Sequence, residues 1–242
     1  MILYCGDNTQ DTAASYLQAI MQNAKLEFSY LNSNSTLTQE SLANCKCLIL
    51  SDYPSTNISE DVEDQIIEKV KMGMGFLMIG GWESFHGKNG EYNHRKLREI
   101  LPVECANEDD RINFSQPCLM ITQQDHDIVR DLSFHNTPPM VGGLNKVITK
   151  KDSTEIISAR SFSIDGDLYF KAGEEYPLLV ISEYENGRCG AFMSDVAPHW
   201  VGGFVDWGTE RVIETIHSNE VEFGNEYCTF FQQLIHWCSK QS

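Results

Sequence analysis

Basic residues are scarce in this chain. Lys and Arg together number 18 among 242 residues, against 35 Asp and Glu, which leaves a formal net charge of −17. An acidic surface repels the phosphate backbone of nucleic acids and the anionic head groups of a membrane, and no Lys/Arg cluster offsets that repulsion. The composition therefore excludes nucleic-acid and membrane-surface binding and leaves a small-molecule ligand as the expected partner. It leaves a homo-oligomer open.

Long apolar segments are also missing. No stretch approaches the roughly 18 apolar residues that a membrane span requires. The first residues carry no basic region, no extended apolar run and no small-residue cleavage site, which a signal peptide would need. We expect a cytoplasmic protein.

Paired cysteine motifs are absent, although the chain has eight cysteines. Cys45 and Cys47 are separated by one residue, whereas zinc-binding pairs have two or more between them, and no second pair completes a site. Most of the cysteines stand in apolar runs, which is typical of reduced, buried thiols. We expect neither a disulfide framework nor a bound metal, and the sequence indicates no cofactor.

Apolar strands alternating with amphipathic helices dominate the first 100 residues. The expected strands are residues 2–5, 26–31, 47–50 and 76–79. Helices are expected around Leu17 and Ile20, and around Ile66 and Val70, because apolar residues recur there at helical spacing. Strands that are apolar on both faces indicate a parallel sheet with helices on both sides. We predict an α/β, doubly wound, mostly parallel sheet in a single domain spanning residues 1–242.

The remainder of the chain is less uniform. Residues 107–167 read as a β-rich excursion with short strands at 118–121 and 156–159, followed by another at 168–170. Strands at 178–181 and 188–194 flank Asn186-Gly187, a hairpin-turn signal. A short helix is expected at 209–217 and a final helix at 223–239, whose aromatic stripe is typical of core packing.

Two loops that directly follow strands carry the residue types of a ligand site. The loops are residues 80–87 and residues 194–200. Each combines a Gly or Pro turn with a Trp, a carboxylate and a His. Ligands bind outside the carboxyl ends of parallel strands, so the two loops and the strand-end carboxylates should converge on one cleft. The expected ligand-binding residues are Asp52, Trp82, Glu83, Ser84, His86, Asp195, His199 and Trp200. Candidates for acid–base catalysis are His199, Glu83 and Asp195.

These loops carry a resemblance to a known family. Gly-Gly-Trp-x-Ser-Phe-x-Gly at residues 80–87 and Ser-Asp-x-Ala-Pro-His-Trp at residues 194–200 are similar to motifs of the uncharacterised glutamine-amidotransferase-like proteins, relatives of the class I glutamine amidotransferases and of the trehalose-utilisation (ThuA-like) proteins. The other matching segments are residues 48–54, 102–103, 109–111, 125–128 and 177–179, with Trp207 beyond. The resemblance covers most of the chain and implies a flavodoxin-like fold.

The chain departs from the active class I enzymes at the nucleophile. Those enzymes place a cysteine at a sharp strand-to-helix turn, where it attacks the glutamine amide. The equivalent turn here is Gly80-Gly81-Trp82-Glu83, without a cysteine. Three functions remain: a domain that binds a small polar metabolite, a hydrolase in which His199 or a carboxylate activates water, and a non-catalytic assembly subunit.

Overall fold

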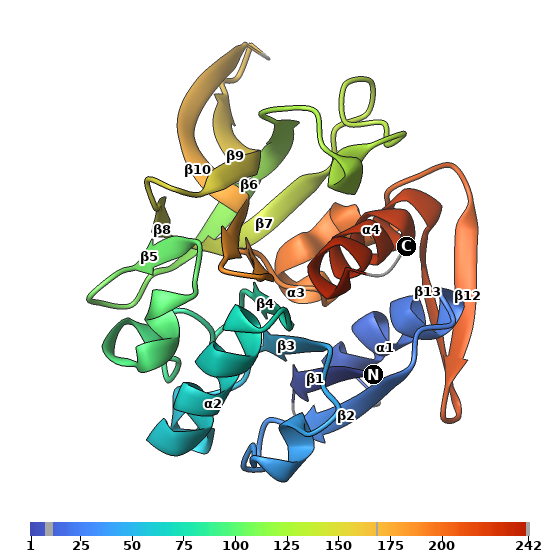
Figure 1. The fold of residues 1–242 in the computed structure, drawn as a ribbon. Coiled ribbons are helices and arrows are strands. Elements are labelled where there is room, and N and C mark those ends of the chain that lie inside the picture. The colour runs from blue at the N-terminus through green and yellow to red at the C-terminus, as the bar shows by residue number, and fades with distance from the viewer. Residues whose placement is uncertain (8–11, 168, 241–242) are drawn as a thin grey trace.

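A nine-stranded mixed sheet forms the centre of the molecule (Figure 1). The structure is a computed structural model that describes residues 1–7, 12–167 and 169–240. In spatial order the strands are β2 (Phe28–Asn32), β1 (Ile2–Gly6), β3 (Cys47–Ser51), β4 (Gly75–Ile79), β11 (Gly187–Phe192), β10 (Phe170–Tyr184), β9 (Thr154–Ile164), β6 (Arg111–Thr122) and β7 (Met140–Asn145). Two short strands, β5 (Val103–Cys105) and β8 (Val147–Thr149), pair separately.

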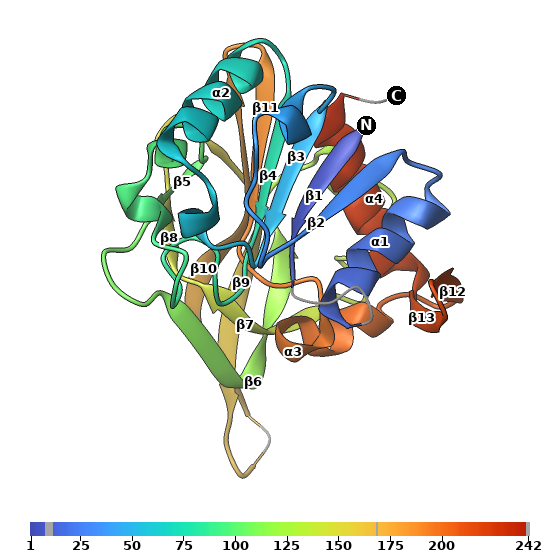
Figure 2. The same ribbon diagram turned by 90° about the horizontal axis from the view of Figure 1, so that it is seen from below.

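The first half of the sheet is parallel, from β2 through β1, β3 and β4 to β11. Every residue of β1, β3 and β4 is buried. Figure 2 shows why: helix α2 (Glu60–Lys71) lies on one side of these strands, and α1 (Ala13–Asn23) and α4 (Asn225–Ser239) lie on the other. The predicted parallel strands of the N-terminal half are confirmed, and their carboxyl ends share one edge.

The second half is antiparallel, through β11, β10, β9, β6 and β7. Tyr184 pairs with Gly187, so the predicted hairpin at Asn186-Gly187 is confirmed. The β-rich middle is also present, but its strands β6, β9 and β10 are much longer than expected. Residue 168, the first of the expected strand 168–170, lies outside the described residues.

The helix expected at residues 209–217 was wrong. The segment forms β12 (Arg211–Ile216), which pairs with β13 (Asn219–Gly224) in a hairpin. The β-branched residues Val212, Ile213, Thr215 and Ile216 favour a strand, and burial alternates along most of it. Phe223 consequently belongs to β13, and the final helix begins at Asn225.

Aromatic rings of α4 form the core beneath the sheet, as the stripe predicted. The ring centroids of Phe231 and Phe192 are 5.4 Å apart in an edge-to-face arrangement, and those of Tyr227 and Phe231 are 5.0 Å apart. Such geometry stabilises aromatic pairs beyond the area they bury. All eight cysteines are free, and seven of them are buried. Every helix within the described residues is too short or too polar to cross a membrane.

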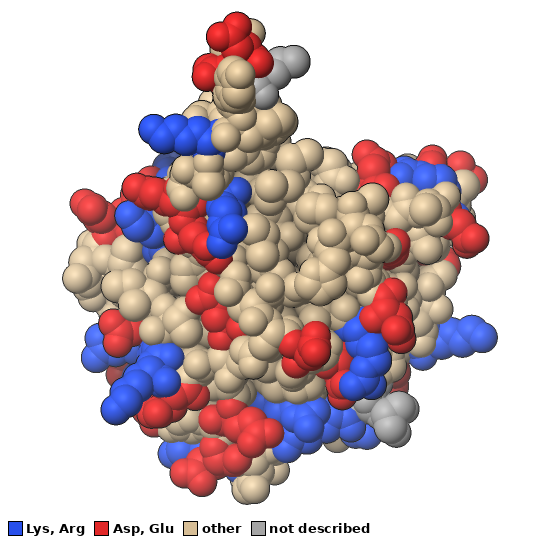
Figure 3. All heavy atoms as spheres, turned by 90° about the horizontal axis from the view of Figure 1, so that it is seen from above, with Lys and Arg blue, Asp and Glu red and all other residues tan. Residues whose placement is uncertain are grey.

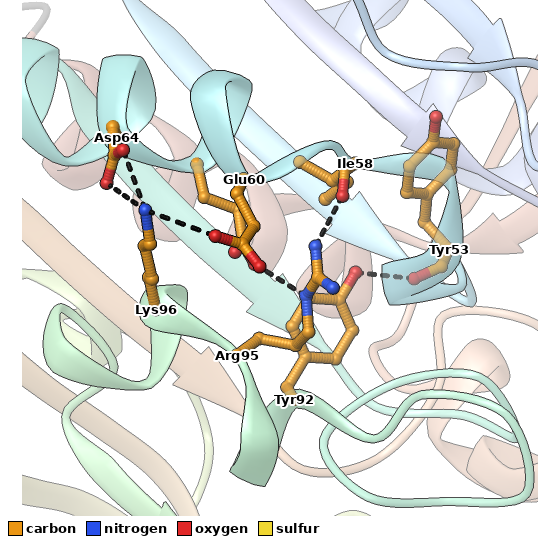
Figure 4. A network of polar contacts seen from close by, with 8 residues as sticks. Tyr53, Ile58, Glu60, Asp64, Tyr92, Arg95 and Lys96 are labelled. Atoms are coloured by element: carbon orange, nitrogen blue, oxygen red, sulfur yellow. Dashed lines mark hydrogen bonds and ion pairs between the residues drawn. The ribbon is translucent and has the colours of Figure 1, made fainter.

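Polar contacts fasten α2 to the segment that follows β4 and its long loop (Figure 4). Nε of Arg95 lies 3.0 Å from Oε1 of the buried Glu63, and the same guanidinium donates to the carbonyl of Ile58 at 2.5 Å. The hydroxyl of Tyr92 donates to the carbonyl of Tyr53 at 2.6 Å. The far end of the loop is thereby held against α2 and the segment that precedes it.

Candidate functional site

Four neighbouring strands deliver acidic side chains to one edge of the sheet. Asp7 follows β1, Asp52 follows β3, Glu83 lies in the loop after β4, and Asp195 is the third residue after β11. A cavity of about 260 Å³ opens at this edge. Its lining residues are Asp7, Ser33, Asp52, Trp82, Glu83, Lys88 and Asn89.

The backbone is unusual where these strands end. Asp7 and Asp52 adopt φ values of 40° and 46°, in the left-handed region that non-glycine residues seldom occupy. Asp tolerates this region better than most residues do. Gly81 adopts φ 150°, and a Cβ there would lie 2.0 Å from Oδ1 of Asp52. Gly81 therefore lets the backbone pass directly over the Asp52 carboxylate.

The loop after β4 is fixed to the end of β3 by hydrogen bonds. Oδ1 of Asp52 accepts from the backbone N–H of Glu83 at 2.8 Å. The buried Oγ of Ser84 accepts from the N–H of Asp52 at 3.1 Å and donates to the carbonyl of Ile79 at 2.5 Å. Ser84 thus positions the loop, and both hydrogen-bonding roles of its hydroxyl are taken by the protein.

Asp7, Asp52 and Asp195 have raised pKa values. Burial is the main cause for Asp7, and the charge of Asp195 adds to it, so that its pKa reaches about 7 although Tyr4 donates a hydrogen bond at 2.7 Å. Burial raises the pKa of Asp195 to about 6, against the effect of the backbone N–H groups of Val196 and Ala197. Burial, followed by the charges of Asp195 and Asp7, raises the pKa of Asp52 well above its usual range.

These carboxyl groups titrate as a set, because the charge of each raises the cost of ionising its neighbours. Near neutral pH the set retains protons that isolated carboxyls would lose. A protonated carboxyl can donate a hydrogen bond, and an ionised one can accept from a hydroxyl or pair with a cation. The arrangement can therefore hold polar ligands of either kind.

The two predicted loops meet beside the cavity. The ring centroids of Trp82 and His199 are 6.3 Å apart, although the residues are far apart in sequence. His199 is exposed at the start of the short helix α3 (Pro198–Val201). The guanidinium of Arg111 lies 4.5 Å from the centre of the Trp82 ring, where it makes a cation–π contact. Trp82 remains 44% exposed and is a surface on which a ligand can pack.

Of the eight predicted ligand-binding residues, three line the cavity, namely Asp52, Trp82 and Glu83, and five do not, namely Ser84, His86, Asp195, His199 and Trp200. Trp200 is 1% exposed, and its Nε1 donates to Oδ1 of Asn113 at 2.9 Å. Its ring fills the space left by the missing side chain of Gly143, so it packs in the protein instead of facing the cavity. Nδ1 of His86 lies 3.0 Å from Oδ1 of Asn93, and His86 is not part of the cavity lining.

Asp110 and Asn145, which were not among the predicted site residues, position the loop by hydrogen bonds to its backbone. The carboxylate of Asp110 accepts from the N–H groups of His86 and Gly87 and from the side chain of Asn145, at 2.7–3.0 Å. Oδ1 of Asn145 accepts from the N–H of Gly81 at 2.9 Å. The only available signal was the charged run at residues 109–111, which also carries the family resemblance.

Among residues 1–7, 12–167 and 169–240, no group of three or more His, Cys, Asp and Glu side chains is placed to hold a metal ion.

Several solved structures are similar to this chain. No curated protein matches the chain. A cytoplasmic protein of Salmonella typhimurium LT2 is 25% identical with a TM-score of 0.75, and another of Salmonella typhimurium is 21% identical with a TM-score of 0.76; each match covers 98% of both chains. A ThuA-like protein of Parabacteroides merdae ATCC 43184 is 14% identical with a TM-score of 0.59, over 98% of this chain and 88% of that one.

The sequence profile of one family spans most of the chain. It is the GATase1-like family, described as "Putative glutamine amidotransferase", and it matches residues 5–219. The resemblance inferred from the two loop motifs is thereby confirmed. The chain belongs to the glutamine-amidotransferase-like family.

Proposed function

We propose that this protein binds a small polar metabolite, one that carries hydroxyl groups or an amine, at the carboxyl ends of its parallel strands. The observation that carries the proposal is the joint placement of Asp7, Asp52 and the exposed face of Trp82 around one cavity. The similar Salmonella typhimurium structures are of cytoplasmic proteins, which supports a cytoplasmic location for this chain as well.

The residues that line the cavity offer aromatic, hydrogen-bonding and charged contacts to a ligand. An indole face packs on the C–H surface of a sugar or attracts a cation. Carboxylates accept hydrogen bonds from hydroxyl or ammonium groups, while Lys88 and Asn89 offer donors from the same lining. A cavity of about 260 Å³ suits a ligand of small size.

We infer further that the chain does not hydrolyse glutamine. The reaction requires a thiolate at the site, and the lining of this cavity contains no cysteine. Cys5 is the cysteine nearest in sequence to the strand-end carboxylates, but it is wholly buried within β1, and burial raises the pKa of its thiol well above the ordinary value. A protonated, enclosed thiol is a poor nucleophile.

Glutaminase activity should accordingly be absent. Purified protein incubated with glutamine should release no ammonia above a no-enzyme blank, and 6-diazo-5-oxo-norleucine, which alkylates glutaminase cysteines, should add no mass. A glutaminase of known activity serves as the positive control. Ammonia release together with a labelled cysteine would contradict the inference.

Ligand binding should raise the melting temperature. We expect one class among neutral sugars, polyols and small amines to stabilise the protein, since a ligand at about 100 times its Kd adds about 2.7 kcal/mol. Asp52→Asn should weaken that ligand by up to about tenfold, because the amide cannot reproduce all the hydrogen bonds of the carboxyl group, each worth about 0.5–1.5 kcal/mol. Asp152→Asn, at an exposed loop position, is the matched control.

The stabilisation results, together with a test for turnover of the bound compound, distinguish ligand binding from hydrolysis. If no class of compound stabilises the wild type, the binding proposal fails. If the bound compound is also converted, and His199→Ala abolishes conversion while retaining binding, the protein is a hydrolase. The structure offers one reason to include this variant: His199 lies beside Trp82, and its charge lowers the pKa of Asp195.

A further inference from the structure

The strand-end cavity contains more carboxyl groups than basic groups. Asp7, Asp52 and Glu83 line it, and Lys88 is the one basic side chain among the described residues of its lining. Asp195 is close enough for its charge to raise the pKa values of both Asp7 and Asp52. The cavity therefore has an excess of negative charge whenever these carboxyls are ionised.

Acidic side chains elsewhere have basic neighbours. On the face shown in Figure 3, acidic and basic side chains lie next to each other at several places. Lys96 and Asp64, for example, form an ion pair of 2.7 Å. The guanidinium of Arg111, which packs on the Trp82 ring, is likewise paired with Asp109 at 2.6 Å. This guanidinium already has a carboxylate partner of its own, so the excess of carboxyl groups in the cavity remains.

Asp7 lies in the cavity wall with neutral partners. It is 7% exposed, and the hydroxyl of Tyr4 donates to its Oδ2 at 2.7 Å. The hydroxyl of Tyr30 donates to its backbone carbonyl at 2.5 Å. Ionising a carboxyl that is this deeply buried is costly unless a cation pairs with it. A cation bound in the cavity would supply the missing charge.

We propose that the ligand of this cavity is a small primary amine without a carboxylate or phosphate group, and that its ammonium group pairs with the Asp7 carboxylate. The inference rests on the ligand-binding function proposed above and narrows it to one charge type. An ammonium group has three N–H donors for the surrounding carboxyl oxygens, and the exposed ring of Trp82 attracts a cation. A neutral ligand would supply no opposite charge, and an acidic ligand would be repelled by Asp52, Glu83 and Asp195.

Binding of such an amine should release a proton from Asp7. Burial, together with the charges of Asp195 and Glu83, raises the pKa of Asp7 to about 7, so about half of the free sites hold this proton at pH 7. The ammonium group favours the ionised carboxylate, and the proton leaves to the solvent. The titratable and charged groups around Asp7 are Tyr4, Tyr30, Asp52, Glu83, Lys88 and Asp195, and His199 acts on Asp195.

Calorimetric titration with matched compounds tests the charge of the ligand. The pairs are putrescine and 1,4-butanediol, ethanolamine and ethylene glycol, and glucamine and sorbitol, with 4-aminobutyrate as an amine that also carries a carboxylate. We expect one of the three amines to bind, and its neutral partner and 4-aminobutyrate to bind about tenfold or more weakly. The Kd of the amine should fall about tenfold from pH 6 to pH 8, and titrations at pH 7 in phosphate and in Tris should show release of about half a proton per amine.

Asp7→Asn removes the charge and keeps nearly the same shape. The variant should bind the amine about tenfold or more weakly at pH 8, without the dependence on pH and without proton release. Asp152→Asn, at its exposed position, should behave as the wild type, and melting temperatures verify that both variants are folded. A neutral compound that binds as tightly as its amine, or an Asp7→Asn variant with unchanged affinity and proton release, would overturn the amine proposal and leave ligand binding standing. If no compound of either kind binds, both proposals fail.

Discussion

Ionisation of Asp7 should lower the free energy of unfolding by about 4 kcal/mol as the pH rises from near 4 to near 8. The pKa of Asp7 is raised from its ordinary 3.8 to about 7, so the folded protein binds a proton that the unfolded chain has already released. Each pKa unit is worth about 1.4 kcal/mol. Stability from this group is fully present below pH 3.8 and is lost as the pH rises through about 7.

Ionisation of Asp195 and Asp52 also lowers the free energy of unfolding as the pH rises. The pKa of Asp195 is raised to about 6 and that of Asp52 is raised as well, chiefly by burial. Their protonated forms are also favoured by folding, so they steepen the loss within the same pH window. Because the three groups repel one another when ionised, neutralising one of them relieves the other two.

Asp7→Asn isolates the contribution of this carboxyl. The variant should match the wild type near pH 4 and exceed its stability at pH 8, because an amide cannot ionise and keeps nearly the same shape. Urea unfolding at a series of pH values measures the difference. Asp152→Asn, at its exposed position, should leave the pH dependence unchanged. An undiminished slope in Asp7→Asn would show that the strand-end carboxyls are not coupled to folding.

The parallel half of the fold could be predicted because its strands are buried on both faces. Continuous apolar runs such as residues 47–50 and 76–79 leave few other assignments, and their neighbouring helices show the 3.6-residue period. The full length of β10 could not be predicted in the same way, although a strand was expected at 168–170. Residues 170–174 are exposed throughout, and part of this segment is held as a strand by pairing with β9.

Some residues of the candidate site could be predicted from the sequence and others could not. Asp52, Glu83 and Asp195 could be predicted because the carboxyl ends of parallel strands must share an edge, whatever the loops do. The placement of Trp200 could not, because its ring occupies space left by Gly143, more than fifty residues away. Asp110 acts on backbone N–H groups of another loop, and no local pattern reveals such a distant partner.

Gly81→Ala should destabilise the protein by about 4 kcal/mol and abolish ligand binding. Its Cβ would lie 2.0 Å from Oδ1 of Asp52, and the φ of 150° is one that residues with a side chain rarely adopt. Overpacking typically costs about 1–3 kcal/mol, and a strained backbone conformation adds about the same. The Asp52 carboxylate must move or the loop must lift, and either change removes a wall of the cavity.

A double-mutant cycle distinguishes the two causes. Asp52→Ala removes the atoms that the new methyl group would strike, so Gly81→Ala should cost about 2 kcal/mol less in that background than in the wild type. The remaining cost reports the backbone conformation alone. Chemical denaturation of the four proteins measures the coupling. Additive losses would show that Asp52 does not pack against Gly81, and that the close approach of the two strand ends is not what builds the cavity.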